Sequence, residues 1–89
     1  MIKVNDVFEA EGKDYITLDK IIFNGQEYIF TNELENDEPT KIFRVFRLKE
    51  NGIVEVTDKG VLSQILPTFS KNMNDKLEVI NESYAGLFN

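Results

Sequence analysis

The chain has 89 residues, contains neither cysteine nor histidine, and carries a formal net charge of −6 at pH 7. A chain of this length forms one small domain, with too little interior for both a core and a buried cofactor cleft. The missing residue types exclude a disulfide framework, a thiolate zinc site and a serine, histidine and acid triad. We therefore expect a protein that is not an enzyme and that holds no metal or cofactor.

The charge is unevenly distributed along the chain. Residues 1–40 contain ten acids and three lysines, a net charge of −7, whereas residues 41–89 contain seven basic and six acidic residues, a net charge of +1. A negative protein repels nucleic-acid phosphates at long range, which disfavours nucleic acid as a partner. The N-terminus lacks the features of a signal peptide, and no stretch approaches the ~18 apolar residues of a membrane span. We expect a cytoplasmic protein with no membrane partner.

A first strand is predicted over residues 3–10. The dipeptide Glu11-Gly12 then predicts a two-residue turn, which places Phe8 opposite Tyr15 on the next strand. The resulting hairpin would form one edge of a sheet.

The next two predicted strands, residues 14–23 and 26–34, are rich in β-branched and aromatic side chains. Asn24-Gly25 separates them and is a strong hairpin signal, because both turn positions need a positive φ. The implied register makes the hairpin apolar on both faces. One face would carry Tyr15, Ile21, Phe23, Tyr28 and Phe30, and the other Ile16, Leu18, Ile22 and Ile29.

An acidic run follows, with four carboxylates in six residues before Pro39: Glu33, Glu35, Asp37 and Glu38. Its plain interpretation is a solvated loop between a strand ending near Leu34 and one starting near Lys41. Alternatively, these acids join those of the first hairpin, Glu9, Glu11 and Asp14, and that of Glu27 in a negative surface for a positively charged partner.

Residues 41–49 form a locally basic predicted strand. We expect a three-residue loop over residues 50–52 to follow it, with Leu48 opposite Val54. As an alternative function, this strand would bind single-stranded nucleic acid with Phe43 and Phe46 as stacking groups. The cations of that alternative site are Lys41, Arg44, Arg47 and Lys49.

A helix is predicted after Thr57 or Asp58, either of which can cap it. Apolar residues then recur at helical spacing: Leu62, Ile65, Leu66, Phe69, Met73, Leu77 and Ile80. Pro67 removes a backbone donor within this stripe, so we expect the element to be kinked or split there. The predicted architecture is α+β, a five-stranded antiparallel β-meander with this C-terminal helical element. Residues 1–80 would form a single domain and residues 81–89 a C-terminal tail.

The stretch "EGKDYITLDKIIFNGQEYIFTNELENDEPTKIFRVFRL" and the acid-capped helix after it resemble short, acidic, uncharacterised proteins of Firmicutes and of their phages and integrative elements. The resemblance covers about Glu11 to Leu77 and consists of turn chemistry. It implies a cytosolic mobile-element protein and identifies no functional residues.

One helix cannot cover both apolar faces of the hairpin. Cover for the second face would come from the tail, the helical piece after Pro67, a second copy or another protein. We therefore expect a non-catalytic protein-binding module whose partner is another protein or a homodimer, for example a phage or mobile-element inhibitor of a host defence or regulatory protein. Its partner-binding residues would be the acidic run and the face of Ile16, Leu18, Ile22 and Ile29. A small carboxylate- or cation-dependent enzyme is the remaining alternative.

Overall fold

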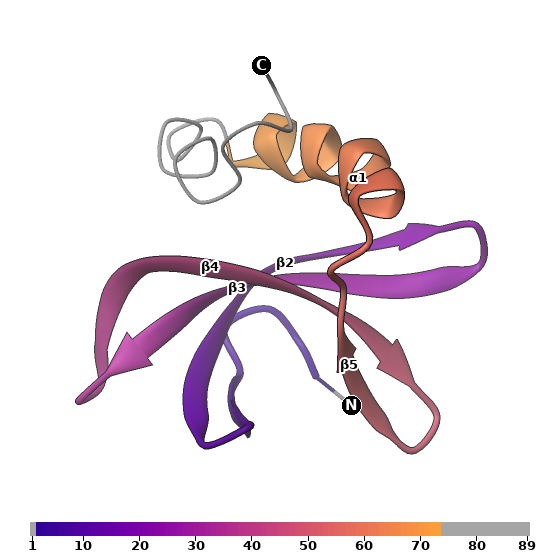
Figure 1. The fold of residues 1–89 in the computed structure, drawn as a ribbon. Helices are drawn as coiled ribbons and strands as arrows, with labels where there is room; N and C mark the ends of the chain where they lie inside the picture. Colours follow the sequence, from indigo (N-terminus) through magenta and orange to yellow (C-terminus); the bar gives the residue numbers. More distant parts are fainter. Residues whose placement is uncertain (1, 74–89) are drawn as a thin grey trace.

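The computed structural model describes residues 2–73, which form a five-stranded sheet and one helix (Figure 1). The strands are β1 (Val7–Ala10), β2 (Lys13–Phe23), β3 (Gln26–Glu35), β4 (Glu38–Lys49) and β5 (Gly52–Glu55), and the helix is α1 (Lys59–Asn72). The strands pair antiparallel in chain order and curl into a half-barrel with α1 on its outer face. This confirms the predicted α+β meander with a C-terminal helix. Leu77, Ile80 and the predicted tail over residues 81–89 lie outside the described residues.

The first two turns are formed as predicted. Glu11 and Gly12 both have positive φ (53° and 80°), as do Asn24 and Gly25 (52° and 74°). The first turn sets Phe8 opposite Tyr15, and the second sets Ile21 opposite Tyr28. Turn residues that tolerate a positive φ therefore determine the register of both hairpins.

The first strand is shorter than the predicted span of residues 3–10. Asn5 has a φ of 78°, and a turn forms in which the Asp6 amide donates to the Lys3 carbonyl (2.9 Å). The Asp6 carboxylate in turn accepts from the Lys3 amide (2.9 Å). The chain therefore folds back before β1 begins at Val7.

The acidic run is not the six-residue loop that was expected. Strand β3 continues to Glu35, β4 already begins at Glu38, and only Asn36 and Asp37 form the turn, with φ of 52° and 65°. Asparagine and aspartate tolerate this left-handed conformation better than other non-glycine residues, which explains the tight turn. The predicted end of β3 near Leu34 is thus within one residue, whereas the predicted start of β4 near Lys41 was wrong by three residues.

The register of the last hairpin also differs from the prediction. Leu48 lies opposite Ile53 and Phe46 opposite Glu55, so the turn is the two residues Glu50 and Asn51. Gly52 supplies the positive φ (147°), but from the first position of β5. The predicted pairing of Leu48 with Val54 was wrong by one residue, which changes the face on which every β5 side chain lies.

Helix α1 packs on the sheet through the predicted stripe. The Asp58 carboxylate caps it by accepting from the Val61 amide (3.0 Å). The stripe residues Leu62, Ile65, Leu66 and Phe69 are buried against Tyr28, Phe30, Phe43 and Val45, and Met73 packs beside them. Phe69 stacks on Phe30 with ring centroids 5.2 Å apart.

Pro67 lies inside α1, which continues to Asn72, so the predicted split does not occur and a kink is not confirmed. A proline at this position leaves the Ser63 carbonyl without its helical donor. Both Ser63 and Pro67 are exposed, so water can satisfy that carbonyl on the solvent side of the helix.

A second, smaller core lies on the inner face of the half-barrel. It consists of Tyr15, Ile29 and Phe46, with Ile2, Phe8, Ala10, Leu48 and Ile53 packed at its margin. Phe8 contacts Phe46 edge to face at 5.5 Å, which joins β1 to β4 across the concave side. Within the described residues, the curl of the sheet and the N-terminal segment (residues 2–6) thus cover this face. The prediction had assigned this cover to the tail, the later helical piece, a second copy or another protein.

A β-bulge in β2 explains why the predicted faces were mixed. Thr17 pairs with Thr31 and Asp19 with Phe30, so Leu18 is an extra residue. The bulge reverses the alternation of side chains, so Tyr15, which precedes it, belongs to the inner core, whereas Ile21, which follows it, packs with Leu18 against the core beneath α1 (the helix-side core). The predicted grouping of Tyr15 with Ile21, and of Leu18 with Ile29, was wrong.

Candidate functional site

The antiparallel registers bring two acidic turns to the same end of the sheet. Asp14, at the start of β2, pairs with Leu34, at the end of β3, so the β1–β2 and β3–β4 turns are neighbours there. We call this the acidic end and define it by six exposed residues: Glu9, Glu11, Asp14, Glu35, Asp37 and Glu38. No ion pair joins these carboxylates to a lysine or arginine within residues 2–73.

Two pairs of like charges lie directly across strands at the acidic end. Glu9 is opposite Asp14 on β1 and β2, and Glu35 is opposite Glu38 on β3 and β4. Like charges in directly opposed positions destabilise a sheet. The dense negative charge at this end therefore lowers the stability of both hairpins.

Glu33 does not contribute to that surface, although the sequence grouped it with Glu35, Asp37 and Glu38. It lies within β3, is 7% exposed, and faces Tyr15 across the strands. Arg44 lies beside this pair, and its Nε is 3.5 Å from Glu55 Oε2. Glu33 is thus part of a polar group on the inner face, not of an exposed loop.

The environment of that polar group acts on Tyr15. Burial raises the pKa of the Tyr15 phenol, and the negative charges of Glu33 and Glu55 raise it further. The Arg44 guanidinium opposes this change through its charge and a hydrogen bond to the phenol. The neutral phenol is therefore the form that the fold favours.

The four residues of the predicted apolar partner face are not brought together. Ile29 is fully buried in the inner core, and Leu18 packs on the helix-side core. Ile16 is half-buried, whereas Ile22 is 74% exposed. Of the four, Ile22 alone therefore presents most of its side chain to solvent.

The basic residues of β4 are also separated. Arg44 pairs with Glu55 on the inner face, whereas Arg47 Nη1 donates to Gln26 Oε1 (3.0 Å). The expected stacking rings, Phe43 and Phe46, are 3% and 4% exposed and belong to different cores. These residues do not form one exposed surface of cations and aromatic rings.

An open groove lies at the end of the sheet opposite the acidic end. Its volume is about 820 Å³, and its lining includes Ile2, Glu27, Arg47, Leu48, Lys49 and Ile53. The sequence did not predict this groove, because the groove forms only when the N-terminal segment packs against the half-barrel.

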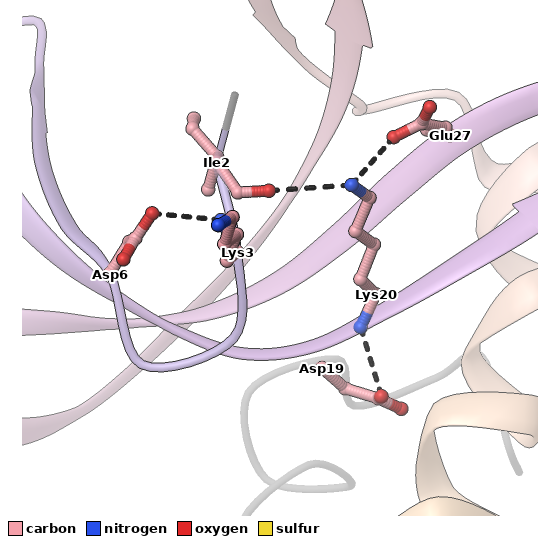
Figure 2. A network of polar contacts seen from close by, with 6 residues as sticks. All are labelled: Ile2, Lys3, Asp6, Asp19, Lys20 and Glu27. Carbon is pink, nitrogen blue, oxygen red and sulfur yellow. Dashed lines mark hydrogen bonds and ion pairs between the residues drawn. The ribbon is translucent and has the colours of Figure 1, made fainter.

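Lys20 contacts two residues of the groove lining, Ile2 and Glu27, as Figure 2 shows. Its Nζ is 2.9 Å from Glu27 Oε2 and donates to the Ile2 carbonyl at 3.4 Å. The Lys20 amide donates to Asp19 Oδ1 (2.9 Å), and Asp19 Oδ2 accepts from Asn72 Nδ2 at the end of α1 (2.8 Å). One lysine therefore holds the N-terminal segment and β3 together from β2.

Residues 2–73 include no group of three or more acidic side chains placed to hold a metal ion. In this part of the chain, no helix has the length and apolar character required to cross a membrane. No protein-family model, curated protein or solved structure matches the chain. The acidic end and the groove are therefore the two features of the chain from which a function can be inferred.

Proposed function

We propose that this chain is a non-catalytic protein-binding module that uses its acidic end to contact a basic surface of another protein. The observation that carries the proposal is the pair of like-charge cross-strand contacts, Glu9 with Asp14 and Glu35 with Glu38. Sequences depart from rules of local stability mainly where function requires it.

A concentrated charge of this kind increases the rate of association with a basic partner and selects against acidic ones. Such a surface can also occupy a basic nucleic-acid channel in another protein. The sequence resembles short acidic proteins of Firmicutes and of their phages and integrative elements. This resemblance favours one form of the function, an inhibitor of a host defence or regulatory protein that is encoded by a phage or mobile element.

The test is affinity capture from a bacterial host lysate by the full chain at low ionic strength. We expect a stoichiometric partner that is released at about 1 M salt, where screening shortens the Debye length to about 3 Å. Recovery of no such partner would count against the proposal.

Two matched variants locate the contact. Asp37→Asn and Glu50→Gln each remove one negative charge from an exposed hairpin turn, at the acidic end and at the opposite end respectively. Asparagine tolerates the φ of 65° at position 37, so the first variant retains its turn. We expect Asp37→Asn to weaken capture and Glu50→Gln to leave it unchanged, and equal capture by both would refute the assignment.

A further inference from the structure

The groove has an apolar floor at the mouth of the half-barrel. Ile2, Leu48 and Ile53 are half-buried, line the groove and pack at the margin of the inner core. The volume of about 820 Å³ is within the range of roughly 300–1,000 Å³ typical of small-molecule sites, which often lie in barrel mouths. An apolar ligand body placed here would remove these three side chains from water.

Polar contacts already hold part of the groove lining in place in the free protein. Lys20 holds the Ile2 carbonyl and the Glu27 carboxylate at the same time (Figure 2). Arg47 is held by its hydrogen bond to Gln26. A ligand would therefore meet an arranged site and would not have to order the N-terminal segment.

The rim of the groove has an excess of positive charge in an acidic protein. Its cations are Arg47 and Lys49, and its acids are Glu27 and Glu50. Lys20 neutralises Glu27 at 2.9 Å, which leaves the lining with one acid, Glu50, and two cations. Lys49 is exposed and forms no ion pair within residues 2–73.

We propose that this groove binds a small amphipathic carboxylate of the medium-chain fatty-acid class. Its chain lies over Ile2, Leu48 and Ile53, and its carboxylate is held by Lys49 at the rim. This site is at the opposite end of the sheet from the acidic end, so the inference goes beyond the proposed protein-binding function and is independent of it.

Titration with decanoate, below its micelle-forming concentration and followed by amide NMR signals, tests the proposal. We expect saturable shifts at Gly25, Leu48, Gly52 and Ile53, which line the groove. Each methylene removed from the probe should weaken binding by about fourfold if it is buried in the complex. Absence of saturable shifts at millimolar decanoate would overturn the proposal.

Head-group charge is tested separately from the apolar contact. Nonyltrimethylammonium has the same nine-carbon chain with a cationic head and should bind more weakly, so equal binding would overturn the role of the rim cations. Lys49→Gln should weaken decanoate binding by up to about fivefold. Lys13→Gln removes an exposed lysine at the other end of the sheet and should not weaken it. Equal effects of the two substitutions would refute the assignment of Lys49.

Discussion

Neutralising either member of the Glu35–Glu38 pair should stabilise the protein. The two residues close the Asn36–Asp37 turn and lie directly opposite each other, and both are exposed. Glutamine preserves the shape and β-strand geometry of each side chain while removing its charge. We therefore expect Glu35→Gln, Glu38→Gln and the double variant all to be more stable than the wild type.

The magnitude follows from the geometry of the pair. Two unit charges about 5.5 Å apart in water repel by about 0.75 kcal/mol. Screening over a Debye length of about 8 Å at physiological ionic strength reduces this to about 0.4 kcal/mol. For a domain of this size, that gain corresponds to an increase in Tm of about 2–3 °C.

The assay is a double-mutant cycle from denaturant unfolding, measured at low and at high salt. Because either substitution removes the whole repulsion, the double variant should gain no more than each single variant from this pair. Glu50→Gln is the control, since Glu50 is an exposed turn acid with no carboxylate opposite it. A coupling energy of zero at low salt, or a gain that does not shrink as salt is added, would refute the reasoning.

Three further substitutions test the fold. Phe69→Ala should cost about 3–5 kcal/mol in denaturant unfolding, because Phe69 is fully buried and stacks on Phe30, and a loss below about 1 kcal/mol would contradict the described core. Asn32→Ala should cost about 1–3 kcal/mol, because Asn32 Nδ2 donates to two β4 carbonyls (2.8 and 2.9 Å), and an unchanged midpoint would argue against that contact. The raised pKa of Tyr15 favours the protonated phenol in the fold, so its contribution to stability is present below its usual value of 10.0 and is lost as the pH rises above it. Tyr15→Phe should reduce this alkaline loss in unfolding measured as a function of pH, and an unchanged slope would refute it.

The elements of the fold were predictable where local chemistry alone decides them. Asn24-Gly25 and Glu11-Gly12 specify two-residue turns, and the helical spacing from Leu62 to Phe69 specifies the buried face of α1. The Asn36–Asp37 turn was missed because neither residue is glycine, although both tolerate a positive φ. A turn at that dipeptide predicts a hairpin and places Glu33 within the strand before it.

The faces of the sheet were less predictable because irregularities in the strands shift them. After the bulge at Leu18, the side chains of β2 lie on the opposite faces from those that strict alternation predicts. A second shift in register lies between Asn32 and Leu34 on β3. Asn32 is a signal that was missed: a buried amide within a strand is placed to satisfy carbonyl groups that the sheet leaves unpaired. Strict alternation could not predict either shift, since the period of two fails at a bulge.

The same curvature that misled the sequence reasoning also determines where a partner can bind. A flat sheet would have left its second apolar face for a partner, but the curled sheet buries Ile29 and Phe46 beneath Phe8 and the N-terminal segment. The two candidate sites therefore lie at the two ends of the sheet, where the turns are. One end carries unpaired carboxylates and the other an apolar floor with a basic rim, so the two ends suit ligands of different charge. Binding at one end should leave binding at the other unchanged, because the two sites share no side chain.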